Sequence, residues 1–281
     1  MRAVIVPLLV SIVGSRLAGQ DTSAHHPAAH DSANHDSSAV RREIREGDSL
    51  NVARHPEAAL TRYRAAIALD SASDEALWKA ARELVDIAKQ IDPQDDAAKK
   101  RRDSLYVEAR GLAEAATRHN PKNSDAHAMV AQALGRLSRT RGGKERVRFA
   151  RIIYDEAMQA IALDSSNDIA YHIIGAWNAE IKRLSGIQRF FAKTLFGAGF
   201  MDQANWDDAQ RYLERAVALR PDNIYHHLEL AQVYVDVKKY TAARAQLTAI
   251  QPLPVWDYLD PKNKQDAAAL LDEIKDKQDK T

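Results

Sequence analysis

The chain has 281 residues, of which 45% are hydrophobic and 28% are charged, and its formal net charge at pH 7 is +1. A charge so close to zero gives no overall attraction to nucleic acid or to an anionic membrane. The absence of cysteine excludes disulfides, thiolate nucleophiles and cysteine-ligated zinc sites.

Residues 1–24 have the pattern of a secretory signal peptide. Arg2 precedes an apolar run from Ala3 to Gly14, and small residues follow around Gly19 and Ala24. The run is shorter than the roughly 20 residues that a membrane-spanning helix needs. We therefore expect cleavage near residue 19 or 24, an exported protein in the periplasm or outside the cell, and no transmembrane span in the mature chain. Retention of this segment as an uncleaved anchor is the alternative.

Residues 25–40 are predicted to form a polar linker rich in His, Ser and Asp. Histidines beside Asp31 and Asp36 would suit zinc, copper or nickel. The other interpretation is a plain tether, because no rigid helix is expected to hold these imidazoles in a coordination geometry. We predict the tether, with no metal and no other cofactor. The histidines are His25, His26, His30 and His35.

The remaining chain, residues 41–281, carries a degenerate helical repeat. Ala209, Leu213, Ala216 and Pro221 match the end of the second helix of a tetratricopeptide repeat. The same register closes units at positions 71, 121, 165, 221 and 255, and only the last interval has the standard length of 34 residues. The pattern predicts an all-α, tetratricopeptide-like solenoid of antiparallel helix pairs, with long insertions and a right-handed superhelix.

Helix boundaries follow from proline stops and polar starts, and no segment alternates long enough to predict a strand. Asp74, Ser124 and Asp168 are expected to be N-caps or first-turn acids. We expect helices at roughly 40–52, 55–70, 74–90, 95–118, 124–138, 144–164, 168–184, 187–196, 204–220, 224–237, 240–250 and 262–278.

Short strings of distinctive residues recur in order through residues 55–275. In this order and spacing they resemble the regulator of microtubule dynamics protein family. The strings are Leu77-Trp78 with Ala81-Arg82, His172 with Gly175 and Trp177, Gln188-Arg189 with Ala192-Lys193 and Leu195-Phe196, Tyr234 with Lys239-Tyr240, and Asp266-Ala267 with Leu270-Leu271.

The resemblance implies a tetratricopeptide-like domain that acts as a non-enzymatic adaptor. Members of the family are associated with microtubules and spindle poles, and in one branch the helical domain is implicated in phospholipid binding. An exported chain would be separated from cytoplasmic microtubules. The sequence also has Gly197-Ala198-Gly199-Phe200 where the family has a proline pair. We therefore expect the fold and the binding role to carry over, rather than the microtubule role.

First-helix positions that face the concave side of such a solenoid form the first candidate site. Their mixture of aromatic and polar side chains suits an extended peptide or a lipid. His172 and Trp177 have a second interpretation as a packed, hydrogen-bonded core pair. The register places on this surface Trp78, Arg82, Asp125, Gln132, Arg136, His172, Tyr225, Leu228 and Gln232.

The insertion at 186–201 is the second candidate site. On a helix Phe191 and Leu195 share one face, and Arg189 and Lys193 share another. One interpretation is a short helix that plugs the concave surface and completes the core. The other is an amphipathic lid over an apolar groove, whose cations face a phosphate or an acidic peptide.

Two basic stretches complete the candidates. The first stretch, between residues 136 and 151, could dock anionic lipid headgroups or an acidic partner tail, or it could be a solvated helix-hairpin turn. The second, Lys99-Lys100-Arg101-Arg102, is predicted to be a solvated face because Asp95, Asp96 and Asp103 offset it. The first stretch contains Arg136, Arg139, Arg141, Lys144, Arg146, Arg148 and Arg151.

Catalytic and metal motifs are missing from the sequence. It contains no G-x-S-x-G, H-E-x-x-H, Rossmann glycine fingerprint or EF-hand loop. We therefore predict a non-enzymatic scaffold that grips a protein segment in its concave groove and does not bind nucleic acid. The alternative is a phospholipid-binding or lipid-transfer module that uses the 186–201 insertion.

Overall fold

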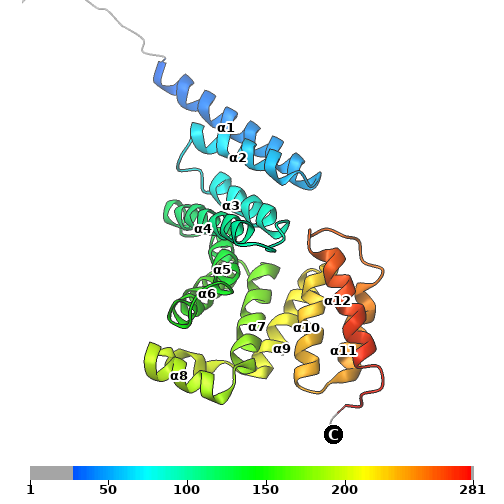
Figure 1. The fold of residues 1–281 in the computed structure, drawn as a ribbon. Coiled ribbons are helices and arrows are strands. Elements are labelled where there is room, and N and C mark those ends of the chain that lie inside the picture. The colour runs from blue at the N-terminus through cyan, green and yellow to red at the C-terminus, as the bar shows by residue number, and fades with distance from the viewer. Residues whose placement is uncertain (1–27, 280–281) are drawn as a thin grey trace, which may run out of the picture.

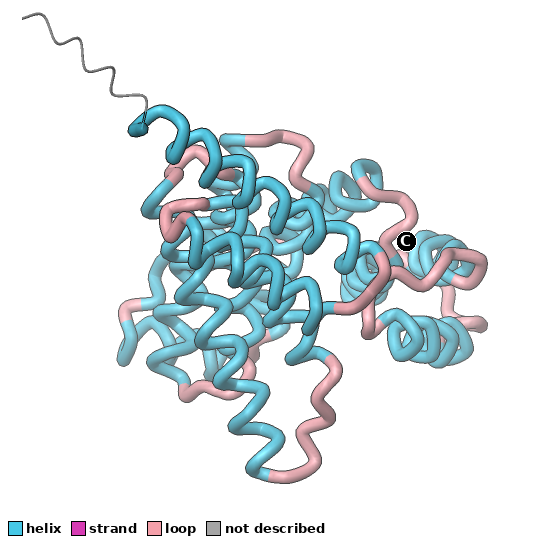
Figure 2. Tube along the Cα trace, turned by 90° about the horizontal axis from the view of Figure 1, so that it is seen from above, coloured by secondary structure: helices cyan, strands magenta, loops and turns pink. Residues whose placement is uncertain are grey.

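The structure is a computed structural model that describes residues 28–279, with side chains from residue 37 onward. In this part of the chain every regular element is a helix, and loops join the helices without any strand (Figures 1 and 2). The predicted all-α solenoid is confirmed. The elements are α1 (Ala28–Val52), α2 (Pro56–Leu69), α3 (Asp74–Lys89), α4 (Asp96–His119), α5 (Ser124–Ser138), α6 (Gly143–Leu163), α7 (Asp168–Arg183), α8 (Gly186–Phe196), the 3-10 helix η1 (Ala198–Gln203), α9 (Trp206–Leu219), α10 (Ile224–Asp236), α11 (Tyr240–Ile250) and α12 (Asp260–Glu273).

The second helices of the pairs bury a face made largely of alanine. On α2, Ala59 and Ala66 are fully buried on either side of Tyr63. Spacings of three and four residues place these side chains on one face, and their small size allows the paired helix to approach closely. The same positions are buried on the later second helices, at Ala109, Ala113 and Ala116, at Ala157 and Ala160, at Ala209, Leu213 and Ala216, and at Ala243 and Leu247.

Polar side chains cap the starts of the first helices α3, α5, α7 and α10. The amide oxygen of Asn167, for example, accepts a hydrogen bond of 2.9 Å from the backbone N–H of Ala170. The equivalent caps of α3, α5 and α10 are Ser73, Asn123 and Asn223. The sequence predicted Asp74, Ser124 and Asp168 as N-caps or first-turn acids. None of the three is the cap, but each opens its helix, and Asp74 and Asp168 are confirmed as first-turn acids.

The first helix starts earlier than predicted. α1 begins at Ala28, within the segment expected to be a linker, whereas the expected start was residue 40. The predicted signal peptide, residues 1–24, lies outside the described residues. The histidine side chains of residues 25–35 also lie outside the part whose side chains are described, so the tether and metal interpretations of this segment stay predictions.

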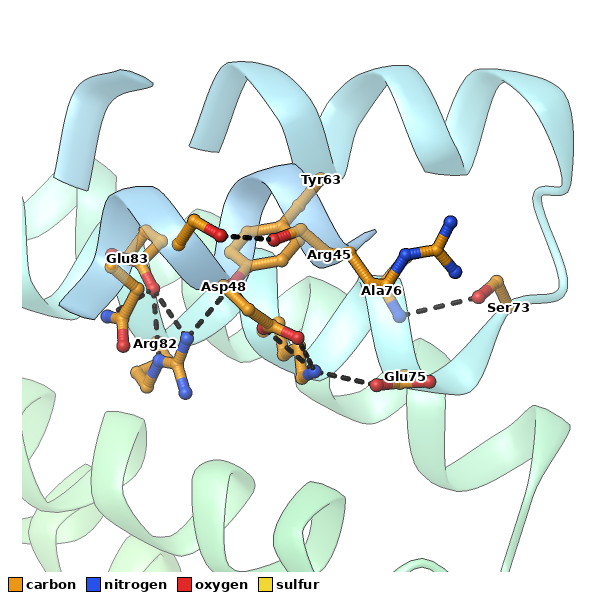
Figure 3. A network of polar contacts seen from close by, with 11 residues as sticks. Arg45, Asp48, Tyr63, Ser73, Glu75, Ala76, Arg82 and Glu83 are labelled. Atoms are coloured by element: carbon orange, nitrogen blue, oxygen red, sulfur yellow. Dashed lines mark hydrogen bonds and ion pairs between the residues drawn. The ribbon is translucent and has the colours of Figure 1, made fainter. Parts of the chain in front are cut away.

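A polar network joins α1 to α2 and α3 (Figure 3). The Tyr63 hydroxyl donates to Asp48 Oδ1 at 2.8 Å, and Lys79 Nζ donates to Asp48 Oδ2 at 2.9 Å. The side-chain amide of Asn51 donates to Glu83 Oε1 at 2.9 Å. Because these contacts bridge three helices, the C-terminal half of α1 is part of the first repeat.

The loop before α12 returns to the first repeat and closes the solenoid (Figure 1). Lys89 Nζ, at the end of α3, donates to Asp257 Oδ2 at 2.6 Å. Arg54, in the turn between α1 and α2, lies 4.9 Å from the ring centroid of Tyr258 and donates to the Val255 carbonyl at 3.4 Å. The two ends of the helical array are therefore in direct contact, which encloses the concave side.

Candidate functional site

The concave side of the solenoid holds a groove with a volume of about 1310 Å³. The first helices α5, α7 and α10 contribute to its lining, together with α4, α6, α8 and the end of α3, and residues 257–266 complete it. These elements meet because the first helices of stacked pairs present the same side to the inside of the superhelix. The groove is the candidate binding site.

Most of the predicted site residues lie together in this groove. Their functional role stays a prediction, but their common location follows from the helical register used in the sequence analysis. The predicted residues that line the groove are Gln132, Arg136, His172, Trp177, Phe191, Tyr225, Leu228 and Gln232.

Trp78 and Arg82, in contrast, do not line it. The Arg82 guanidinium donates to Glu83 Oε1 at 3.0 Å and to the Tyr63 hydroxyl at 3.1 Å, and it lies 5.3 Å from the ring centroid of Trp78. These contacts belong to the network between the first three helices (Figure 3). Arg82 is therefore held in a structural arrangement, and the repeat register placed it correctly on a first helix but not in the groove.

The α8 insertion borders the groove without completing the core. None of its residues is buried, and the Phe191 side chain is 51% exposed although it lines the groove. The interpretation of α8 as a plug that completes the core is therefore wrong. Arg189 and Lys193 do not line the groove, since Arg189 donates to the Lys182 carbonyl at 3.3 Å and Lys193 pairs with Asp202.

His172 belongs to a chain of polar contacts with His226 and Asp168 in the wall of the groove. Its Nδ1 lies 3.0 Å from Nδ1 of His226, whose Nε2 lies 2.8 Å from Asp168 Oδ2. The Tyr225 ring packs on His172 with a centroid distance of 4.6 Å. Burial, followed by the charges of His226 and Arg136, holds the pKa of His172 well below its ordinary value. His172 is therefore neutral at pH 7 and acts as a packed wall residue.

Trp177 is also a packed wall residue. Its side chain is only 6% exposed, its indole N–H donates to the Ala150 carbonyl at 2.7 Å, and its ring lies 4.7 Å from that of Tyr154. The interpretation of His172 and Trp177 as hydrogen-bonded core residues is supported, although each bonds a different partner rather than the other.

Arg136 is central to the groove. Its charge acts on the pKa values of Lys89, His172, Tyr225 and Asp257, which come from α3, α7, α10 and the loop before α12. No carboxylate of a described residue lies within 4 Å of the Arg136 guanidinium, as the ion pairs of this part of the chain show. Arg136 is thus a cation of the groove that forms no ion pair with a described residue, although its charge contributes to the lowered pKa of Asp257.

Some residues of the groove were not among the candidates predicted from the sequence. Arg102, assigned to a solvated face, lines the groove from α4, and its Nε is buried without a hydrogen-bond partner among the described residues. Ile181 and Phe196 also line it. The only signal in the sequence for Arg102 was the end of a basic run, which does not tell which of four consecutive cations turns inward.

The described part of the chain shows neither a metal site nor a membrane-spanning helix. Among residues 37–279, whose side chains are described, no group of three or more His, Asp or Glu side chains is arranged to hold a metal ion. No helix in the same part of the chain combines the length and apolar character needed to cross a membrane.

Comparisons with known proteins identify relatives over most of the chain. The family described as "Regulator of microtubule dynamics protein 1-3" matches residues 44–275. Regulator of microtubule dynamics protein 1 of Bos taurus is 28% identical over 220 residues, which is 78% of this chain and 66% of the relative. The Mus musculus protein of the same name is 27% identical over 204 residues, 72% of this chain and 65% of the relative. The matched region thus spans just under two thirds of the length of these relatives.

Solved structures show the same fold. A thermophilic TPR protein of Thermus thermophilus superposes with a TM-score of 0.58 at 19% identity, covering 83% of this chain and 99% of that protein. For pilF of Pseudomonas aeruginosa the TM-score is 0.50 at 14% identity, with 85% and 93% covered. The tetratricopeptide-like fold is therefore shared with proteins of very different sequence. On the match over residues 44–275, the chain belongs to the regulator of microtubule dynamics protein 1-3 family.

Proposed function

We propose that this chain is a non-enzymatic binding scaffold that grips an extended protein segment in its groove. The observation that carries the proposal is the composition of the groove, where amides and cations alternate with large apolar side chains. The side-chain amides of Gln132 and Gln232 line it, and neither has a hydrogen bond to another described side chain or backbone group. Free amides of this kind suit the backbone of an extended peptide, while aromatic side chains provide anchors.

The relatives are consistent with a binding role, and the N-terminal sequence indicates where the protein would act. The family's name connects it with microtubules, and its tetratricopeptide-like fold is one that protein-binding scaffolds use. Because residues 1–24 have a signal-peptide pattern, we propose export, which would separate the mature chain from cytoplasmic microtubules. The proposed role is therefore peptide binding in the groove rather than the regulation of microtubules.

Selection from a displayed library of random peptides tests this function. The mature chain, residues 25–281, is the bait, and the double variant Gln132→Leu/Gln232→Leu is the counter-selection, because leucine is similar in size to glutamine but cannot hydrogen-bond a peptide backbone. We expect peptides that bind the natural chain at least about tenfold more tightly than the variant. Recovery of no peptide, or of peptides that bind both proteins equally, would contradict the proposal.

A phospholipid-binding module is the second candidate, and the exposed apolar side chains of α8 favour it. Ile187 is 70% exposed, Phe190 62% and Leu195 63%, which is unusual for large apolar groups on a folded surface. Mass spectrometry of lipid extracted from the purified protein separates the two candidates. A stoichiometric phospholipid that Phe191→Asp no longer retains would favour this second function.

A further inference from the structure

We propose that the segment bound in the groove is acidic and carries large apolar side chains. This inference rests on the proposed peptide-binding function and specifies its partner. It starts from the charges that the fold leaves without a partner.

Four of the five carboxylates that line the groove pair with a cation of the chain itself. Asp257 pairs with Lys89, Asp266 pairs with Lys262, and Glu180 and Glu229 both pair with Arg183. Asp92 is the exception among the lining carboxylates, and it accepts a hydrogen bond of 2.6 Å from Gln94. Most carboxylates of the groove are therefore already in contact with a cation, although Arg183 is shared by Glu180, Glu229 and Asp236.

Arginines in the groove are in the opposite situation. Four of them line it without a carboxylate of any described residue within 4 Å, and the Nε of Arg102 is a buried donor with no partner. The guanidinium group binds carboxylates strongly, through two parallel hydrogen bonds. The four are Arg102, Arg136, Arg139 and Arg146.

These arginines are spread over the groove rather than gathered at one point. They come from α4, α5 with its C-cap, and α6, and the charges of Arg136 and Arg139 both act on the Tyr225 hydroxyl of α10. Burial raises the pKa of Tyr225, so this hydroxyl remains a neutral hydrogen-bond donor beside the two guanidinium groups. Cations on three helices suit several carboxylates along one peptide better than the single phosphate of a lipid headgroup.

Apolar side chains border the same groove. Ile187, Phe191 and Phe196 of α8 line it and are all exposed, and Ile181 of α7 lies in its wall. Apolar surface that remains exposed in the free protein gains free energy when a ligand covers it. A peptide that combines acidic residues with Leu or Phe would pair with both parts of the groove.

Two labelled peptides of about twelve residues test the proposal by fluorescence anisotropy. One alternates Asp and Glu with Leu and Phe, and the other has Asn and Gln in place of the acids. We expect the acidic peptide to bind at least about tenfold more tightly at low salt, and this preference to shrink as salt screens the charges. The double variant Arg136→Gln/Arg139→Gln should lose most of the preference, and Arg136→Lys/Arg139→Lys should keep part of it.

The control carries the same change in net charge outside the groove. Arg118 and Lys122 are exposed, do not line the groove and form no ion pair with a described residue, so Arg118→Gln/Lys122→Gln should bind as the natural chain does. An equal loss in the control would show that only net charge matters and would overturn the proposal. Folding of every variant is checked by its thermal melting curve.

The remaining outcomes separate this inference from the function beneath it. Equal binding of both peptides, abolished by Gln132→Leu/Gln232→Leu, would overturn the acidic preference and leave the peptide groove intact. Failure of both peptides together with an empty library selection would overturn both. Sedimentation with vesicles containing about a third phosphatidylserine, without binding of either peptide, would replace the peptide with an anionic lipid surface.

Discussion

Gly175 shows how closely two helices approach in the second half of the molecule. A Cβ at this position of α7 would lie 2.5 Å from Cγ of Leu213 and 3.1 Å from the Ala209 carbonyl oxygen, both on α9. The glycine therefore permits contact between helices that the α8 insertion separates in sequence. The same glycine belongs to the His172, Gly175 and Trp177 string on which the family resemblance rests, and its role is packing.

Replacing Gly175 with alanine is expected to destabilise the fold. The added methyl group has no space, so we expect Gly175→Ala to lower the free energy of unfolding by about 1–3 kcal/mol. Urea unfolding followed by circular dichroism measures the change. Gly111→Ala is the matched control, because a Cβ at that α4 position meets nothing within 4 Å and alanine favours the helix by about 1 kcal/mol. Equal stability of the two variants would refute the role in packing.

His172 links stability to pH. Burial and the neighbouring His226 and Arg136 lower its pKa in the folded state, so the folded state disfavours protonation. The stability that neutral His172 contributes is fully present above the unfolded pKa of about 6.5. It is lost as the pH falls below that value, by up to about 1.4 kcal/mol of unfolding free energy per pH unit. His127 has the opposite sign, because its hydrogen bond to Glu156 raises its pKa.

The variant His172→Gln isolates this effect. Between about pH 7.5 and about pH 5, we expect the natural chain to lose more unfolding free energy than the variant does. His127 is present in both proteins, so its contribution cancels in the comparison. Urea unfolding at a series of pH values gives the two slopes. Parallel slopes would show that His172 titrates normally and that its contacts with His226 and Tyr225 do not keep it buried.

At the scale of elements, α8 differs from the other helices. Ser185 caps its start through a capping box with Gln188, and Gly197 ends it in the left-handed conformation with a φ of 68°. Its ends are thus well defined although none of its residues is buried. The sequence predicted its position almost to the residue, but could not tell whether its phenylalanines enter the core.

Phe191→Asp distinguishes a groove wall from a core plug. Because the Phe191 side chain is half exposed, we expect a change in unfolding free energy of less than about 1 kcal/mol. Binding of any peptide recovered from the library should weaken, since the variant places a negative charge at the apolar wall. Leu213→Asp, on a fully buried position of α9, is the control that should not fold. Loss of folding in Phe191→Asp would restore the interpretation as a plug.

At the scale of the whole molecule, the closure between α3 and the loop before α12 sets the shape of the groove. The Lys89 side chain is only 6% exposed and contacts both Asp86 and Asp257. Burial alone would raise the pKa of Asp257, but the charge and hydrogen bond of Lys89 outweigh it and lower the pKa. This contribution to stability is present above the ordinary pKa of Asp and is lost as the pH falls through the lower folded value.

Lys89→Met should open the closed solenoid. It leaves the partly buried Asp257 without its cation, so we expect a loss of about 1–3 kcal/mol in unfolding free energy and a larger radius of gyration by small-angle X-ray scattering. Lys99→Met, which removes the exposed pair with Asp96, should change neither quantity measurably. An unchanged radius in Lys89→Met would mean that the helix packing alone holds the ends together.

The sequence by itself determined the helices and their order. The spacing of small residues on the second helices, and the prolines and polar caps between pairs, act over a few residues, so they are visible without a structure. The same register was enough to predict that residues as distant as Gln132 and Gln232 lie in one groove, because stacked first helices repeat a common orientation.

Only the tertiary structure decided which of those side chains are free. The repeat register placed both Arg82 and Arg136 on the inner side of a first helix, yet Arg82 is bound by Glu83 and Tyr63, whereas Arg136 forms no ion pair in the described part of the chain. The closure by Asp257 and the inward position of Arg102 also depend on contacts between segments far apart in sequence. Local patterns determine helices because backbone hydrogen bonds and side-chain spacing are local. Pairing of charges is set by distances across the superhelix, which no local pattern contains.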